Sequence, residues 1–371
     1  MKGISFFDSF QCINKDCPFN CCGGWQIEVD SETYQKYQKE PGAFGKELRR
    51  NTCVRNVPQI RQRLGRCPYL TKDKLCGMYL THGEEYMTFA CRMFPRRKVT
   101  YTYKNDIVAE EAYLELSCPE AARLFVETKE PIRFEEVHRE TETCWNFDIE
   151  EMNYYEQLLK MRETIMLLIQ NKMIPFRVLQ QIIYQYVDHC QQPAMRLQYE
   201  EITTYSEKYM QPAFLQEQVQ DLLRIRISLG GKGGTLHKLM EMGIEQVGLR
   251  FLNPKMARLL HMYYRFFNND SYEEVGEFVN TNALKMLEQN PELEIRYRNY
   301  LAYFVHQQLM FATYSYNMTK PVIMAIVYTQ LILVFDICTW YRNKKQFPID
   351  KQIENLYCIH RTAGFSEDVA N

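Results

Sequence analysis

Residues 12–25 read CINKDCPFNCCGGW and place four thiols, those of Cys12, Cys17, Cys21 and Cys22, within eleven positions. Thiolates separated by three or four residues can converge on one metal centre when a tight turn points them inward. Four more cysteines follow in short motifs: Cys67 in CPYL, Cys76 in LCGMY, Cys91 in CRMFPR and Cys118 in SCPE. We therefore predict a metal or iron–sulfur site, with these eight cysteines as the candidate ligands.

The eight candidates are not equivalent. Adjacent Cys21 and Cys22 rarely bind one ion together, so one of them points away or serves a second centre. Four thiolates suit zinc and iron–sulfur alike, although the absence of paired Cys-x2-Cys knuckles disfavours a zinc ribbon. The remaining thiols lie outside the motifs and are predicted to be ordinary buried cysteines: Cys53, Cys144, Cys190, Cys338 and Cys358.

The distribution of cysteines also bears on the compartment. Ten of the thirteen lie in the first 144 residues, the total is odd, and no apolar signal segment follows Lys2. A disulfide framework would suit a small secreted chain, but 371 residues can bury a core without staples. We expect a reducing, cytoplasmic setting.

The amino-acid composition restricts the kinds of partner that the protein is expected to bind. The formal net charge is −1 and 25% of the residues are charged, so nothing argues for nucleic acid or for a strongly charged partner. The apolar stretch Val322–Val334 is shorter than the roughly 20 residues that a membrane span needs. It is predicted to be a buried helix rather than a membrane segment.

The pattern predicts two regions, and a mostly α fold. Residues 1–148 should form a small mixed α+β, cysteine-rich region, with a strand at Trp25–Val29, a helix capped by Asp30 or Ser31, and a hairpin of Arg97–Tyr103 with Ile107–Leu116. Pro119 should begin a further helix.

Residues 149–371 should be an all-α helical body, because apolar residues recur there at helical spacing without a βαβ alternation. A glycine-rich segment at 228–235 lacks the order of a phosphate-binding loop and is predicted to join two helices. The later helices are expected at Pro254–Phe267, Tyr272–Glu288, Leu293–Tyr314, Pro321–Tyr341 and Ile349–His360.

The cysteine motifs, in this order and spacing, resemble those of the flagellin lysine-N-methylase family over residues 10–125. The first cluster and the CRMFP element are shared with a wider group of zinc- or iron-chelating domains. The Gly-Trp after Cys22, the Pro-Arg-Arg after Cys91 and the SCPE motif are more similar to the methylase.

The resemblance implies methyl transfer from S-adenosylmethionine to lysines of flagellin, with a cysteine-bound centre that is a [4Fe–4S] cluster, or zinc as the alternative. No glycine-rich dinucleotide-type loop announces a standard methyltransferase fold, and the sequence singles out no catalytic base. Arg92, Arg96 and Arg97 are either salt-bridge donors beside the cysteines or contacts for a substrate carboxylate. The rival function is a non-enzymatic metal-binding or metal-delivery module fused to a helical interaction domain.

Overall fold

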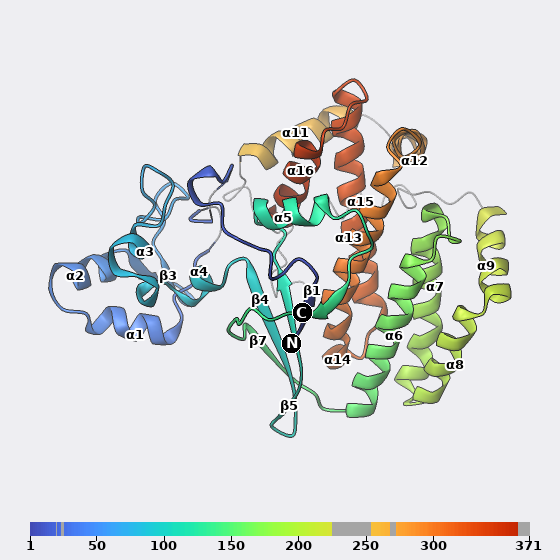
Figure 1. Ribbon diagram of the computed structural model, residues 1–371, viewed down its shortest axis with the longest axis horizontal. Helices are drawn as coiled ribbons and strands as arrows, with labels where there is room; N and C mark the ends of the chain where they lie inside the picture. The colour runs from blue at the N-terminus through green and yellow to red at the C-terminus, as the bar shows by residue number, and fades with distance from the viewer. Residues whose placement is uncertain (20, 24–25, 225–253, 268–271, 363–371) are drawn as a thin grey trace.

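The computed structural model describes residues 1–19, 21–23, 26–224, 254–267 and 272–362. Expectations for Trp25 and for the glycine-rich segment at 228–235 lie outside these residues. Figure 1 shows a sheet in the middle of the molecule, a small lobe on one side of it and a stack of helices on the other. The fold is mostly α, as predicted.

The predicted hairpin is present and forms the middle of a five-stranded sheet. Lys104 and Asn105 turn the chain between its two strands with φ values of 52° and 72°. Positive φ at both turn residues matches the twist of a short hairpin, and asparagine tolerates it better than most residues. The sheet order is β6-β1-β5-β4-β7, with β1 at Lys2–Ile4, β4 at Arg96–Tyr103, β5 at Asp106–Leu114, β6 at Phe134–Glu136 and β7 at Trp145–Asp148.

Residues 26–93 form the small lobe around a core of its own. Asp30 caps its first helix, as predicted, by accepting from Thr33 N at 2.9 Å, and its second carboxylate oxygen accepts from Phe89 N at 2.7 Å. The elements of this lobe are α1 (Ser31–Lys39), α2 (Gly42–Arg50), β2 (Thr52–Val54), β3 (Pro58–Ile60), α3 (Gly77–His82), η2 (Glu84–Tyr86) and α4 (Phe89–Met93), and the short turn η1 (Asn14–Asp16) precedes it.

The strand predicted at Trp25–Val29 is wrong over its described part. Glu28 makes one isolated bridge to Gln59, and no ladder continues from it. The alternation that suggested a strand reflects burial instead, since Ile27 and Val29 are 1% and 2% exposed in the small core.

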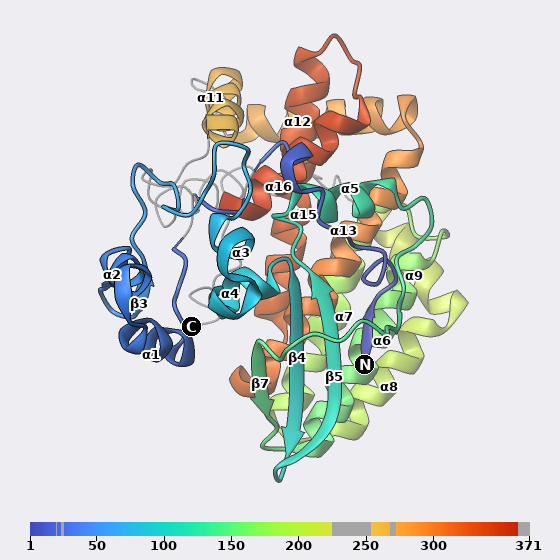
Figure 2. The ribbon, with the colours of Figure 1, turned by 60° about the vertical axis from the view of Figure 1, so that its left-hand side comes forward.

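The helices after residue 148 cover one face of the sheet (Figure 2). Their apolar faces are buried as the helical spacing indicated; Met161, Ile165 and Leu168 are fully buried. The single helix expected at Leu293–Tyr314 is broken, because a 3₁₀ turn interrupts it after Gln308. Helix α5 (Pro119–Glu127) precedes this group. The helices described after residue 148 are α6 (Met152–Gln170), α7 (Phe176–Met195), α8 (Tyr199–Met210), α9 (Pro212–Arg224), α11 (Pro254–Phe267), α12 (Tyr272–Gln289), α13 (Glu292–Gln308), η4 (Leu309–Phe311), α14 (Ala312–Ser315), α15 (Thr319–Arg342) and α16 (Ile349–Thr362).

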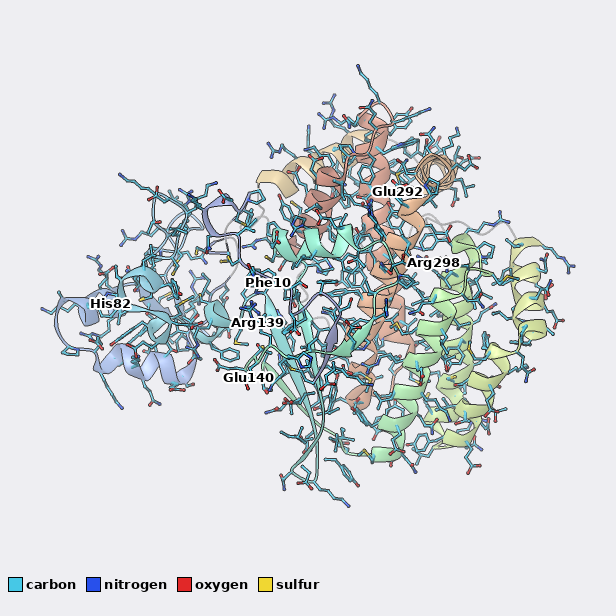
Figure 3. All side chains as sticks on the ribbon, viewed as in Figure 1. Phe10, His82, Arg139, Glu140, Glu292 and Arg298 are labelled. Carbon is cyan, nitrogen blue, oxygen red and sulfur yellow. The ribbon has the colours of Figure 1, made fainter. Side chains whose placement is uncertain are left out.

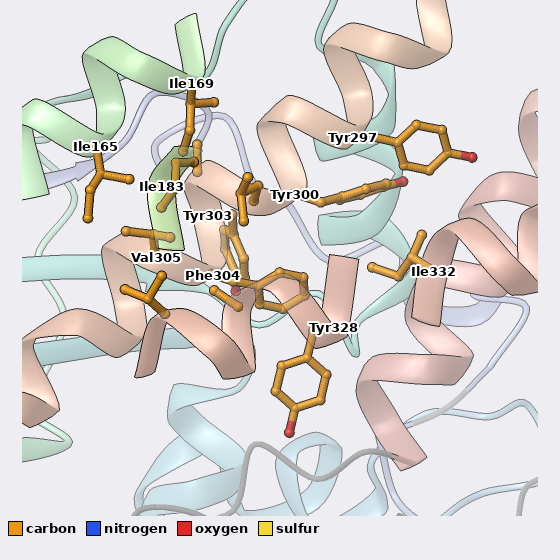
Figure 4. Close-up of a cluster of buried hydrophobic side chains, with 14 of the residues drawn as sticks. Ile165, Ile169, Ile183, Tyr297, Tyr300, Tyr303, Phe304, Val305, Tyr328 and Ile332 are labelled. Atoms are coloured by element: carbon orange, nitrogen blue, oxygen red, sulfur yellow. The ribbon is translucent and has the colours of Figure 1, made fainter. Parts of the chain in front are cut away.

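One large core joins the sheet to the helices and runs from Ile4 to Ile359. Tyrosines of α13 lie at its centre and meet aliphatic side chains of α6, α7 and α15 (Figure 4). Tyr297, Tyr300 and Tyr303 are all completely buried. These tyrosines therefore pack in the helical core, as expected. The boundary between two domains that the sequence predicts after residue 148 stays a prediction.

Helix α15 is confirmed as a buried helix. It has 24 residues, more than the apolar stretch indicated, and by length and composition alone it could cross a membrane. However, 67% of its most apolar window is buried inside the protein, and Thr329 and Asp336 are completely enclosed.

Candidate functional site

Three predicted ligands line the core of the small lobe, where Cys67, Cys76 and Cys91 pack against the same apolar cluster. Cys22 belongs with them, because its carbonyl oxygen accepts from Cys67 N at 2.7 Å. A bridge between Leu70 and Cys76 brings the Cys67 and Cys76 segments side by side. Cys91 sits in α4, whose first turn is fixed by the cap that Thr88 provides.

The other predicted ligands lie toward the large core. Cys118 is 8% exposed, belongs to that core and precedes α5 as its N-cap residue. Its thiol interacts electrostatically with those of Cys17 and Cys12. Cys17 interacts in turn with Cys21. Cys21 and Cys22 therefore stand where the two groups of thiols meet.

Burial makes most of these thiols hard to ionise. It raises the pKa of Cys67 to about 11 and that of Cys91 to about 12, and repulsion from neighbouring thiolates adds to the effect. Cys21 is different. A hydrogen bond from the Cys22 side chain lowers the pKa of Cys21 from its usual value, burial opposes this, and the Arg361 guanidinium assists it. Of the two adjacent thiols, Cys21 is therefore the one whose surroundings favour the thiolate.

Arg361 reaches this region from α16, at the other end of the chain. Its Nη2 donates to the carbonyl oxygen of Gly23, next to Cys22, and its guanidinium carbon lies 4.1 Å from the Phe19 ring centroid. Burial lowers its pKa to about 10, while the nearby thiols of Cys21 and Cys118 favour its charge. A buried cation is therefore held among the thiols by a backbone carbonyl and an aromatic face.

Two further arginines fix the backbone just before Cys12. Arg139 Nη1 donates to Phe10 O at 2.8 Å, and Figure 3 shows these two residues close together. Arg96 Nη2 reaches the same oxygen at 3.4 Å, and its guanidinium lies 4.9 Å from the Phe10 ring. Arg92 pairs with Glu142 at 3.6 Å. Arg92 is therefore a salt-bridge donor, as one of the two predicted alternatives had it, whereas the contacts given for Arg96 are with the backbone carbonyl and the ring of Phe10.

The donor chemistry fits a thiolate-bound centre, because the side chains that converge are thiols and a cation stands beside them. Among the described residues, however, no three Cys, His, Asp or Glu side chains stand close enough to hold a metal ion. The described thiols are gathered into one region but are not closed into a ligand shell.

The cysteines outside the motifs divide by burial. Cys190, Cys338 and Cys358 are completely buried, as predicted. Cys53 and Cys144 are only partly buried, so the expectation was wrong for these two. Cys53 lies in the two-stranded hairpin of β2 and β3, which is too small to cover it.

A buried charge network that the sequence did not reveal joins the sheet to the helices. Arg162 of α6 pairs with Glu111 of β5, and Nη1 of Arg162 lies 3.0 Å from Glu111 Oε2. Tyr101 and Tyr113 donate their hydroxyls to the same carboxylate oxygen. Burial would raise the pKa of Glu111, but Arg162 and nearby His306 hold it at about 2. The pair stays ionised and locks α6 onto the sheet.

A small cavity of about 40 Å³, open to solvent, lies between the sheet and the end of α13. Its sheet side is contributed by β4, β5 and β7, and its helix side by residues 307–311. It therefore lies where the N-terminal region meets the helices. The lining residues are Arg97, Val99, Tyr101, Tyr113, Glu115, Trp145, Phe147, Gln307, Gln308, Met310 and Phe311.

A second cleft, of about 370 Å³ and also open to solvent, lies between α13 and residues 129–132. Its central cation, Arg298, is labelled in Figure 3 and donates to Ile169 O at 2.7 Å and to Ile174 O. Asn299 accepts from Ile132 N at 3.0 Å and donates to Glu130 O at 3.0 Å. Arg298 and Asn299 thus hold α13 against the backbone of residues 130–132 and 169–174.

Comparisons with known proteins add to this picture. No solved structure matches the chain. The Flagellar biosynthetic protein FliU of Salmonella muenchen is 32% identical over 124 residues, which cover 31% of this chain and 70% of that protein. The Lysine-N-methylases of Salmonella typhimurium and Salmonella choleraesuis show the same identity over 124 residues, and the match covers 30% of their length.

The family model described as the FliB lysine N-methylase C-terminal domain matches residues 162–371. These are the residues of the helical body, from α6 onward, that carry Arg162, Arg298 and Arg361. The motif resemblance of residues 10–125 and this match cover different parts of the chain and agree. The chain belongs to the FliB lysine N-methylase family.

Proposed function

We propose that this protein transfers methyl groups from S-adenosylmethionine to lysine side chains of flagellin, in the cytoplasm. Membership of the lysine N-methylase family carries this proposal. The name of the FliU relative supports a flagellar substrate, and the names of the two Salmonella methylases support the reaction. Because the chain spans 30% of the length of those methylases, their activity is extended to it here as an inference.

We further propose that the thiols hold a [4Fe–4S] cluster, with zinc as the alternative. Cys67, Cys76 and Cys91 would supply ligands from the small lobe, with Cys21 or Cys22 beside them. Cys12, Cys17 and Cys118 complete the candidate set from the other side. When bound, such a centre would brace the region, and an iron centre would also supply a Lewis acid for the amino and carboxylate groups of the cosubstrate.

The chain must also prepare the amine. A lysine has a reference pKa near 10.4 and has to lose a proton before it attacks a methylsulfonium. Its lone pair then forms the new C–N bond while the S–C bond breaks, and the sulfonium becomes a neutral thioether. A desolvated slot lowers the pKa of the amine, and a carboxylate can accept its proton. The cavity beside Glu115 places such a carboxylate next to aromatic walls.

Mass spectrometry of unmethylated flagellin incubated with the protein and S-adenosylmethionine tests the proposal. The expected result is a series of mass gains of one CH₂ each on surface lysines, and calorimetry should detect binding of the cosubstrate. Metal-loaded protein that gives neither result would favour the metal-delivery alternative, and it would then release its metal readily to a chelator.

A further inference from the structure

The aromatic cavity beside β4 is built by strand alternation. Side chains at every second position share one face of a sheet, so Arg97, Val99 and Tyr101 of β4 point the same way. The register pairs Val99 with Trp145 and Tyr101 with Phe147, which places two aromatic rings of β7 beside them. All five residues line the cavity.

The cavity already holds a cation of the protein itself. Nε of Arg97 lies 2.6 Å from Oε1 of Glu115, and the guanidinium carbon lies 4.4 Å from the Trp145 ring centroid. The Glu115 side chain is only 10% exposed, whereas that of Arg97 is 30% exposed. A fixed carboxylate and an aromatic face therefore flank a cation whose side chain reaches the surface.

The neighbouring rings continue this surface inward. Tyr101 stacks on Phe147 with centroids 5.5 Å apart, and Phe147 meets Phe311 edge to face at 5.3 Å. A lysine side chain presents a four-carbon apolar stem and a charged tip. The aromatic rings of the cavity can pack against the apolar stem of a lysine, and Glu115 and Trp145 can bind its charged tip.

We propose that this cavity, lined by Arg97, Glu115, Trp145, Phe147 and Phe311, is the slot for the substrate lysine, and that the lysine displaces Arg97 from it. The inference rests on the proposed function, because that function supplies the lysine. The side chain of Arg97 would occupy the slot when no lysine is bound. It would move out of the slot when a lysine enters.

The position of the slot relative to the thiols supports this role. Glu115 and Cys118 are linked by a backbone hydrogen bond, from Cys118 N to Glu115 O at 3.1 Å. A cosubstrate bound at the thiol region would thus have the lysine slot as its neighbour. Cavities between two parts of a chain are common sites for small ligands and side chains.

Binding can be measured without methyl transfer. The probe is a short lysine-containing peptide, and the comparison is the same peptide with norleucine, which keeps an apolar stem but lacks the charge. Calorimetry on the full chain should show binding of the lysine peptide and at least about tenfold weaker binding of the norleucine peptide.

Two variants have opposite expected effects, and a control variant and a fourth substitution accompany them. Arg97→Ala removes the competing side chain and should tighten lysine-peptide binding by about fivefold or more, while Glu115→Gln should weaken it about tenfold. The matched control is Glu110→Gln, because Glu110 pairs with Lys98 at 2.9 Å in the same two strands but outside the cavity, and it should change nothing. Trp145→Ala removes the aromatic face independently, so the test survives if Glu115→Gln does not fold.

Equal effects of Glu115→Gln and Glu110→Gln, unchanged or weaker binding in Arg97→Ala, or equal affinity for the norleucine peptide would overturn the slot. A protein that methylates flagellin while its peptide binding ignores these variants also refutes the slot but leaves the function standing. Peptide binding with the expected variant pattern and no methyl transfer refutes the function alone.

Discussion

Replacing Asp336 by asparagine should remove a large pH dependence of stability. Asp336 is completely buried in α15, where Tyr297 Oη donates to it at 3.0 Å and Asn355 Nδ2 at 2.8 Å. Burial raises its pKa to about 7, although Asn355, Tyr297, Gln352 and the charge of Arg296 favour the ionised form. The free carboxyl of an unfolded chain titrates near 3.9.

The sign follows from proton binding. Between about pH 4 and pH 7 the folded state holds a proton that the unfolded state has lost, so stability falls as the pH rises. The full difference of about three pKa units corresponds to about 4 kcal/mol, and between about pH 5.5 and pH 8 the loss should be about 2 kcal/mol. The amide of the variant has no such proton to lose.

Urea unfolding of the wild type and Asp336→Asn at these two pH values measures the difference directly. The wild type should lose about 2 kcal/mol more than the variant as the pH rises, because the other titrating groups are common to both proteins. Equal losses in the two proteins would show that Asp336 is ionised throughout, and the reasoning from burial would fail.

Three further predictions follow from the contacts described above. Glu111→Gln leaves Arg162 buried without its partner and should cost about 3–5 kcal/mol in a denaturation experiment, whereas Glu110→Gln in the partly exposed pair with Lys98 should cost less than about 1 kcal/mol. Asn299→Ala removes both hydrogen bonds that hold residues 130–132 on α13 and should lower the unfolding free energy by about 2 kcal/mol; an unchanged midpoint would contradict this. Cys17→Ser, Cys76→Ser and Cys91→Ser should lower iron or zinc content by metal analysis, whereas buried Cys338→Ser should not, and equal metal content in all four would rule out the thiol centre.

Local patterns carried much of the fold. The hairpin β4–β5, the cap at Asp30 and helices α11, α15 and α16 could be predicted because alternation, helical spacing and caps are properties of neighbouring residues. The break after Gln308 could not, since the apolar spacing continues through it. The strand at Trp25–Val29 failed because burial on one side of an irregular segment gives the same alternation as a strand.

The candidate sites depend on contacts between residues that are distant in the sequence. The sequence alone did not show these contacts. The sequence identifies Arg97 as a possible salt-bridge donor, and the predicted hairpin could indicate which residues of β5 lie beside it. Trp145 joins it only because β7 returns to the sheet about thirty residues after β5. Arg162 and Glu111 are 51 positions apart, and no local pattern marks such a pair. The cysteine motifs identified the thiols. They did not show that the thiols form two groups, one in the small lobe and one toward the large core.

The contact between Arg361 and Gly23 spans 338 positions, and this has a consequence for biosynthesis. A ribosome adds about 5–20 residues per second, so the cysteines up to Cys118 are synthesised roughly 12–50 seconds before Arg361. Throughout that interval the growing chain carries these thiols without the C-terminal helix that supplies their cation. A nascent chain that stalls before α16 would therefore present the thiols to solvent without the Arg361 partner.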